Sequence, residues 1–249
     1  MTDRIYIYGK HALKEALIFA PDVLEEVFLA KHFDDTEILD LIRSHSINLS
    51  AKMPREVGDG VVHQGIVGMV SLSKLMQDYS EFADQLAVEP STSLVLLDEL
   101  QDPQNVGAVI RNASAFGISG VLIPEHNQAQ VTGAVVKVSA GMAFKIPLVK
   151  IGNINTVIRD LKDRGFAVYG LSANAKYTVT KEEFDMPTLF VLGSEGEGIR
   201  QKTFELCDKV LSIPINPKCE SLNAAASASI AMYTWSTKHP EALKINKIK

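Results

Sequence analysis

The stretch SLVLLDELQDPQNVGAVIRNASAFGISGVLIP, Ser93–Pro124, decides the fold class of this 249-residue chain. Its two ends, SLVLL and GVLIP, are short apolar runs of the kind that form buried strands. Between them, residues from about 105 to 116 favour a helix. Asp102 and Pro103 are typical of a helix start. The Asp102 side chain can accept a hydrogen bond from the first turn, and proline lacks only an N–H group that would have no partner within the helix at that position. A strand, a helix and a second strand predict a parallel βαβ unit.

Apolar runs of the same kind recur on both sides of this unit. Downstream lie KIPLV, FAVYGL, TLFVLG and KVLSIP, each followed by a polar or helical stretch, which predicts an α/β domain with a parallel sheet covered on both faces. Upstream, KHALKEALIFA and DDTEILDLIRSHS have helical patterns, the second started by an acidic cap, and EEVFLA, INLSAKM and GIVGMV favour strands. We therefore expect a small αβ unit at residues 1–72, a polar, acidic linker at 73–90 and a second domain at 91–249.

The composition is that of an ordinary globular protein, with 46% apolar and 22% charged residues. The net charge of −5 argues only weakly against a nucleic-acid partner, because a local basic patch matters more than the sum. The lysines of Lys238–Lys249 form either such a patch or a solvated tail. Cys207 and Cys219 lie far from any C-x-x-C pattern, which favours a reducing compartment. No run approaches the roughly 18 apolar residues of a membrane span, so we expect a soluble cytoplasmic protein without a membrane partner.

The segment Asp98–Gly117 is the first of three that follow strand ends, where open α/β sheets place their ligands. Asn105 falls in the first turn of the predicted helix, and Arg111 lies nearly two turns further on. Helical side chains lean toward the N-terminus, so the Arg111 guanidinium can reach back toward a bound phosphate and ribose. Gly107 permits close approach of another backbone or a ligand. The alternative is a capped helix with one surface arginine.

The second segment, LFVLGSEGEGI at Leu189–Ile199, is a strand followed by a glycine-rich turn. It contains neither the G-K-[ST] of a P-loop nor the order G-x-G-x-x-G. Glu195 is unfavourable beside phosphates but suits an amide or hydroxyl partner. Such a turn indicates little by itself.

The third segment, LSIPINPKCESLNAAASASIAMYTW, runs from Leu211 to Trp235. A strand and a proline-broken loop precede a helix that opens near Glu220–Asn223. Either Ser221 or Asn223 is a candidate helix cap, and the alanines that follow allow close packing against the same chain or a second subunit.

Taken together, the three segments resemble the signature motifs of the SpoU (TrmH-like) branch of the SPOUT methyltransferases. The motifs read DPQNVGAVIRNA at Asp102–Ala113, LGSEGEG at Leu192–Gly198, and IP at Ile213–Pro214 with ESLN at Glu220–Asn223. The resemblance covers residues 91–236. The N-terminal unit, with YGKHALKEAL and HQGIVGMV, resembles the ribosomal-protein-like RNA-binding domain of ribosomal-RNA members, and VKVSAGMAFKIPL resembles members that methylate a guanosine of large-subunit ribosomal RNA.

The resemblance implies an RNA ribose 2′-O-methyltransferase that uses S-adenosylmethionine, works without a metal and is a homodimer. It also implies a trefoil knot in the C-terminal part of the SPOUT domain. The implied catalytic set is Asn105, Arg111, Glu195 and Asn223. The implied cofactor-binding set is Leu192, Gly193, Glu195, Gly198, Ile213, Ser221 and Leu222. One departure is that Ala224 and Ala225 follow Asn223, where members commonly carry N-V-S or N-A-S, so a hydroxyl expected near the site is missing.

The high pKa of a guanidinium limits the roles that Arg111 can have in the reaction. A guanidinium with a pKa above about 12 is a poor base, so we favour Arg111 as the group that binds the adjacent phosphate and stabilises the developing alkoxide. Asn105 and Asn223 would orient the ribose and the site, and Glu195 would hold its loop or a neighbouring amide.

Two alternatives share this fold: the same chemistry on transfer RNA, and a catalytically silent RNA-binding or ribosome-assembly factor. The N-terminal unit disfavours the first and the intact catalytic set disfavours the second. A nucleotide-dependent oxidoreductase lacks its glycine fingerprint. In the N-terminal unit, Lys10, His11 and Gln64 either touch RNA or belong to a solvated face.

Overall fold

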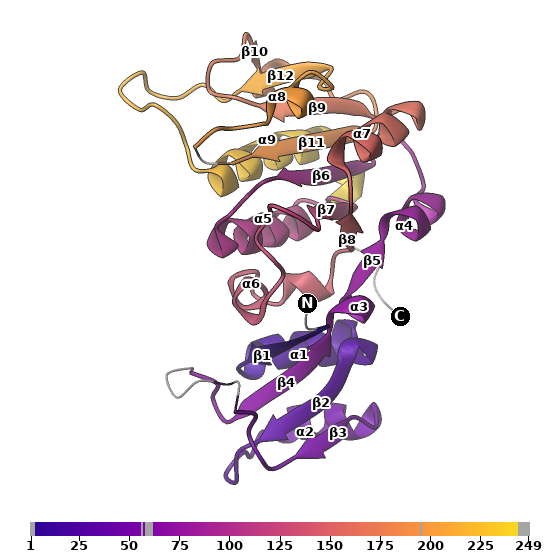
Figure 1. Ribbon diagram of the computed structural model, residues 1–249, viewed down its shortest axis with the longest axis vertical. Helices are drawn as coiled ribbons and strands as arrows, with labels where there is room; N and C mark the ends of the chain where they lie inside the picture. Colours follow the sequence, from indigo (N-terminus) through magenta and orange to yellow (C-terminus); the bar gives the residue numbers. More distant parts are fainter. Residues whose placement is uncertain (1–2, 56, 58–61, 195, 244–249) are drawn as a thin grey trace.

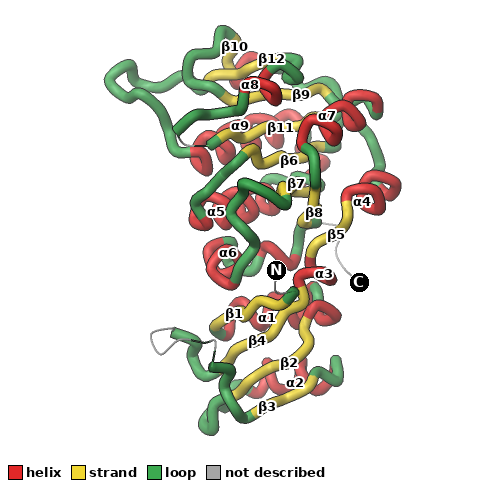
Figure 2. The backbone as a smooth tube through the Cα atoms, viewed as in Figure 1, coloured by secondary structure: helices red, strands yellow, loops and turns green. Residues whose placement is uncertain are grey.

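The computed structural model describes residues 3–55, 57, 62–194 and 196–243. It contains two sheets, and every strand and helix that the apolar patterns predict is present. The described part of the chain contains no helix long and apolar enough to cross a membrane. The smaller sheet lies at one end of the molecule and the larger sheet fills the rest (Figures 1 and 2).

The N-terminal unit is a four-stranded sheet with two helices. Its strands have the order β1-β4-β2-β3, and β4 pairs antiparallel with both β1 and β2. The Asp35 side chain caps α2 by accepting a hydrogen bond from the Ile38 amide at 3.3 Å, the acidic cap that the sequence predicts. The bounds are β1 Arg4–Tyr8, α1 Lys10–Phe19, β2 Leu24–Leu29, α2 Thr36–Ser44, β3 Asn48–Ser50 and β4 Ile66–Ser71.

The second domain is built on an eight-stranded sheet with the order β10-β12-β9-β11-β6-β7-β8-β5. All of its strand pairs are parallel, as predicted. The strands are β5 Met76–Asp78, β6 Ser93–Asp98, β7 Gly120–Pro124, β8 Leu148–Ile151, β9 Ala167–Leu171, β10 Tyr177–Thr178, β11 Thr188–Gly193 and β12 Lys209–Ser212. The helices are α3 Leu72–Leu75, α4 Tyr79–Gln85, α5 Pro103–Ala115, α6 Gly133–Val138, α7 Ile154–Asp163, α8 Gln201–Phe204 and α9 Ala224–Lys238.

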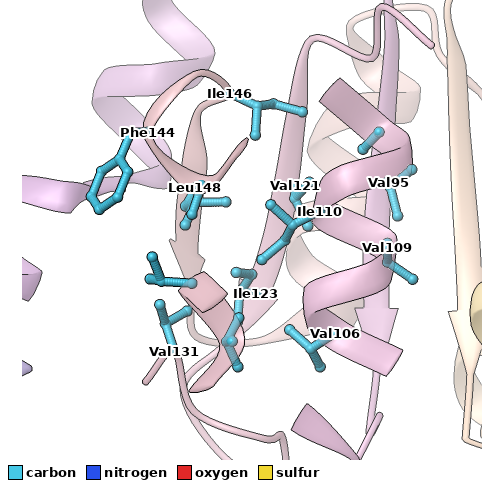
Figure 3. Packing of buried hydrophobic residues seen from close by; sticks show 14 of the residues in the cluster. Val95, Val106, Val109, Ile110, Val121, Ile123, Val131, Phe144, Ile146 and Leu148 are labelled. Carbon is cyan, nitrogen blue, oxygen red and sulfur yellow. The ribbon is translucent and has the colours of Figure 1, made fainter. Parts of the chain in front are cut away.

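Two cores cover the two faces of this sheet. Every residue of β6 is buried, and alternate side chains of the strand enter different cores. Val95 and Leu97 pack with α5 and α9 on one face, and Leu94 and Leu96 pack with α7 on the other. Figure 3 shows Ile110 of α5 beside strand β7. Burying such a side chain contributes roughly 1.5–3 kcal/mol, which fixes α5 against the strands that it follows.

Residues 73–90, expected as a linker, hold most of α3, the strand β5 and the helix α4. β5 pairs with β8 as the edge strand of the large sheet, although three residues carry too little apolar pattern to predict it. The hydroxyl of Tyr79 donates to Asp160 of α7 at 2.5 Å, and Arg164 donates to the Ala83 carbonyl at 2.8 Å. The chain between the two units therefore packs along the second domain, and the boundaries 1–72, 73–90 and 91–249 stay a proposal.

Helix α6 joins the two units closely (Figure 1). A Cβ added to Gly133 would lie 1.9 Å from the carbonyl oxygen of Tyr6 in β1, so only glycine fits there. Nearby, the Lys145 ammonium pairs with Glu15 of α1 at 2.5 Å and lies 4.2 Å from the centre of the Phe19 ring. The N-terminal unit thus has a fixed position against the side of the large domain that carries α5. The knot implied by the resemblance stays a prediction.

Candidate active site

A cavity of about 460 Å³ lies at the carboxyl ends of β9, β11 and β12. These strands are parallel, and β9 lies between the other two, so their ends meet at one edge of the sheet. The volume falls within the roughly 300–1,000 Å³ of small-molecule sites. The walls are formed from the segment after each strand, by residues within 171–174, 192–194, 196–199 and 211–227. We call this the main cavity.

The glycines of LGSEGEG close the wall that follows β11. A Cβ on Gly193 would lie 2.1 Å from the carbonyl carbon of Gly198, so the two backbones can approach only without a side chain there. The Ser194 amide donates to the Gly198 carbonyl at 3.0 Å, and the Gly198 amide donates back at 3.1 Å. Gly198 has a φ of +73°, which glycine adopts without strain. The glycines therefore form a tight loop whose main chain faces the main cavity.

The structure brings most of the predicted cofactor residues together around the main cavity. Glu195 lies outside the described residues. The other six all line the cavity: Leu192, Gly193, Gly198, Ile213, Ser221 and Leu222. Their part in binding a cofactor stays a prediction, but the structure brings residues of the second and third motifs together around one cavity.

The side chains that line the main cavity limit the classes of ligand that it can bind. None of the described residues that line it is a lysine, arginine or histidine, and Glu197 is their one carboxylate. A phosphate-bearing cofactor would find no cation there, whereas a neutral or positively charged ligand meets main-chain groups, apolar side chains and the polar side chains of several serines and Asn174. S-adenosylmethionine, with a neutral adenosine and a sulfonium, fits this donor set.

The first motif lies on helix α5, beside the strand that pairs with β11. The Asp102 side chain accepts from the Gln104 amide at 2.8 Å and so caps the helix as predicted. Asn105 is buried in the first turn, with 8% of its surface exposed. Gly107 meets α6, where an added Cβ would lie 2.6 Å from Val138. Arg111 is exposed, does not line the main cavity, and makes no ion pair or side-chain hydrogen bond with the described residues.

Asn223 caps helix α9, because its side-chain oxygen accepts from the Ala226 amide at 2.7 Å. Of the two candidate caps, Asn223 therefore has this role, and Ser221 lines the main cavity instead. The rings of Phe116 and Tyr233 are 5.7 Å apart, and Asn105 and Asn223 precede these rings by similar lengths of helix. The two helices therefore start at the same edge of the sheet, which places both asparagines at the end where the main cavity opens.

Sequence reasoning missed one wall of the main cavity, formed by residues 171–174 after β9. FAVYGL predicts the strand, but only the strand order shows that its end adjoins β11 and β12. Ser227, one turn into α9, also lines the cavity. It places a hydroxyl near the position at which Ala224 and Ala225 depart from the family pattern.

The half-buried thiol of Cys207 is not a candidate nucleophile. Cys207 packs behind the wall formed by β9, where an added Cβ on Gly170 would lie 3.1 Å from its sulfur. Burial, with a smaller contribution from the Asp208 charge, raises the pKa of Cys207 to about 12, so the thiol stays protonated near neutral pH. Within the described ranges, no group of three or more His, Cys, Asp or Glu side chains is placed to hold a metal ion.

A second cavity, of about 200 Å³, lies between the two domains. Its lining includes His11 of α1, Gln64 and, from α6, Lys137. None of the described lining residues is acidic, and Lys137 forms no ion pair with any residue that the structure describes. Lys10, by contrast, pairs with Asp35 at 3.1 Å. We call this the interdomain cavity.

Comparison with known proteins assigns both domains. Residues 92–233 match the model of the SpoU rRNA Methylase family, and residues 6–76 match the model for RNA 2′-O ribose methyltransferase substrate binding. The 23S rRNA (guanosine-2′-O-)-methyltransferase RlmB of Salmonella typhimurium is 33% identical over 233 residues, which cover 91% of this chain and 96% of that protein.

Solved structures share the fold. The SpoU methyltransferase AviRb from Streptomyces viridochromogenes, in complex with AdoMet, has a TM-score of 0.82 at 22% identity and covers 96% of this chain and 92% of its own. The TrmH/SpoU tRNA-modifying enzyme of A. aeolicus has a TM-score of 0.55 at 22% identity. The match to that enzyme covers only 61% of this chain and 77% of the enzyme.

Proposed function

Because this chain belongs to the SpoU rRNA Methylase family, we propose that it transfers a methyl group from S-adenosylmethionine to the ribose 2′-oxygen of a guanosine in large-subunit ribosomal RNA. The observation that carries the proposal is the main cavity, which is lined by six predicted cofactor residues from two motifs. The substrate follows the relatives that match both domains and are named for 23S ribosomal RNA.

When bound, S-adenosylmethionine supplies a methyl group that its sulfonium has already activated. The chain then has to place the ribose and stabilise the oxygen that loses its proton. Arg111, exposed on α5 and unpaired among the described residues, binds the phosphate next to that ribose and stabilises the developing alkoxide. The proton leaves to phosphate or water. Asn105 and Asn223, at the starts of α5 and α9, orient the ribose and the edge of the site.

A homodimer accounts for the position of Arg111. In one chain Arg111 lies outside the main cavity, so the arginine of one subunit would complete the site of the other. The surface of α9 supports this arrangement, because Tyr233 is 57% exposed beside the small side chains of the helix. Leu222, next to the cap of α9, is 37% exposed.

The RNA substrate would cross the interdomain cavity on its way to the site. Helix α6 packs against α5 on one side and β1 on the other, so Lys137 lies between the N-terminal unit and the helix that carries Arg111. Lys137, which forms no ion pair with the described residues, offers contacts for a phosphate and a ribose together with His11 and Gln64 beside it. The acidic net charge of the chain does not prevent such local binding.

The test is transfer of labelled methyl groups from S-adenosylmethionine to separated ribosomal and transfer RNAs, followed by digestion to nucleosides. We expect 2′-O-methylguanosine from large-subunit RNA, and its loss in Asn105→Ala. Label confined to transfer RNA would overturn the substrate but keep the chemistry. Absence of label in all RNAs, with S-adenosylmethionine still bound, would favour the silent RNA-binding factor.

A further inference from the structure

A fully buried carboxylate lies behind the loop that walls the main cavity. Asp98 is the last residue of β6 and has no exposed surface. The strand register places it opposite Gly193, where the loop begins. A buried charge is strongly unfavourable unless another charge and hydrogen bonds compensate it. The residue that pairs with Asp98 is therefore held firmly in place, and with it the adjoining part of the loop.

That partner is Arg200, the residue that ends the loop. One oxygen of Asp98 accepts from the Arg200 amide at 3.0 Å, and the other accepts from its Nε at 2.7 Å. A guanidinium Nη1 of Arg200 also lies 3.0 Å from the carboxylate of Glu99. The carboxylate of Asp98 thus binds both the main chain and the side chain of Arg200, which fixes the orientation of Arg200 as well as its distance from β6.

The loop is fixed at two points. Gly193 and Gly198 close its base, as the mutual hydrogen bonds of Ser194 and Gly198 show. Arg200 then fixes its exit against β6. The described residues between Ser194 and Arg200, which are Gly196, Glu197, Gly198 and Ile199, all line the main cavity, whereas Asp98 and Arg200 do not.

We infer that Arg200 and Asp98 are positioning residues for the methyl donor, which set the loop after β11 at the distance that S-adenosylmethionine requires. The inference rests on the proposed function of the main cavity. The same contacts join the loop to Asp98 and Glu99, from which the chain leads into α5 and Asn105. The ion pair therefore holds the donor side and the RNA side of the site in one arrangement. Lysine cannot replace Arg200, because it lacks the planar fork that reaches two carboxylates.

The test compares the affinity for S-adenosylmethionine in Arg200→Gln and in a matched control. Lys162→Gln removes another ion pair of this domain, Lys162 with Asp208 at 2.6 Å, and neither residue lines the main cavity. By calorimetry, we expect Arg200→Gln to raise the Kd for S-adenosylmethionine about tenfold or more and Lys162→Gln to leave it unchanged. In the assay of RNA methylation, KM for S-adenosylmethionine should rise more than KM for RNA, because only the donor side contacts the displaced loop directly.

A double variant separates positioning from simple stabilisation. Arg200→Gln leaves Asp98 buried and unpaired, and its Tm should fall. Adding Asp98→Asn removes the charge but keeps an acceptor for the amide of residue 200, so Tm should recover while the Kd stays raised. Recovery of both, or wild-type affinity in Arg200→Gln, would overturn the inference. Lack of binding by the wild-type protein would instead contradict the proposed function.

Discussion

The main cavity and the surface formed by α5 and α6 differ in what they present to a ligand. Main-chain groups, glycines, apolar side chains and several serine and asparagine side chains line the cavity, with Glu197 as its one charged side chain among the described residues. The surface carries Arg111 on α5 and Lys137 on α6, and neither forms an ion pair with the described part of the chain. Function should therefore depend on exact backbone fit in the cavity and on charge at the surface. Under the proposed function, one chain forms the whole cavity, whereas the surface binds RNA and a second subunit.

Arg111→Lys tests whether the charged surface needs the planar guanidinium of Arg111 or only its positive charge. Lysine keeps the charge but loses the planar fork, so we expect the single-turnover rate of RNA methylation to fall about a hundredfold. The Kd for S-adenosylmethionine should stay within about twofold, because Arg111 does not line the main cavity. A near-normal rate would remove Arg111 from the catalytic set.

Gly193→Ala tests the cavity through fit alone. The added methyl would lie 2.1 Å from the Gly198 backbone, so the loop must shift. We expect the Kd for S-adenosylmethionine to rise about tenfold and the free energy of unfolding to fall by about 1–3 kcal/mol, measured by calorimetry and thermal denaturation. Gly152→Ala is the matched control, because Gly152 does not line the main cavity and an added Cβ there meets nothing nearer than Glu125 Oε2 at 4.0 Å. Equal effects of both substitutions would contradict the fit argument.

Dimers formed from two different variants test whether the cavity of one subunit uses the Arg111 of the other. A subunit with Arg111→Lys keeps its cavity, and a subunit with Gly193→Ala keeps its arginine. If Arg111 serves the partner's cavity, each mixed dimer has one complete site, so an equal mixture should recover about a quarter of wild-type activity. Each variant alone is the control. No recovery after subunit exchange, verified by mass spectrometry, would place Arg111 in the site of its own chain.

Lys137→Ala should have the smallest effect. We expect severalfold weaker RNA binding and a decrease of about 0.7–0.9 in the slope of log K against log salt, the value for one lost phosphate contact. Fluorescence anisotropy at several salt concentrations measures both. Arg159→Ala, which removes an exposed charge from α7 on the other face of the sheet, is the control. Identical slopes for the two variants would exclude the interdomain cavity from the RNA path.

What the sequence predicts follows from local pattern. Apolar runs located the strands, and Asp102 and Asp35 were identifiable as caps because their partners lie two and three residues away. The family motifs then predicted six of the residues that line the main cavity. Strand order is a different matter, because it depends on contacts between distant segments, and so the wall at residues 171–174 was not predicted.

Other features depend on packing that no local pattern records. The three residues of β5 pair with β8 through main-chain hydrogen bonds, which any short sequence can form. Asp98 and Arg200 are 102 residues apart, and the burial that makes their contact important is visible only in the fold. Arg111 was expected to reach back toward a bound phosphate and ribose, and this stays a prediction. The structure adds that Arg111 is exposed on α5 and does not line the main cavity.

The most direct test of the proposed chemistry is alkaline hydrolysis of large-subunit RNA that this protein has labelled from S-adenosylmethionine. Alkaline cleavage needs a free 2′-hydroxyl to attack the neighbouring phosphate, so a methylated ribose protects one linkage. We predict that the label remains in a dinucleotide with guanosine at its 5′ position. Label released in a mononucleotide would place the methyl group on a base and contradict ribose 2′-O-methylation by this protein.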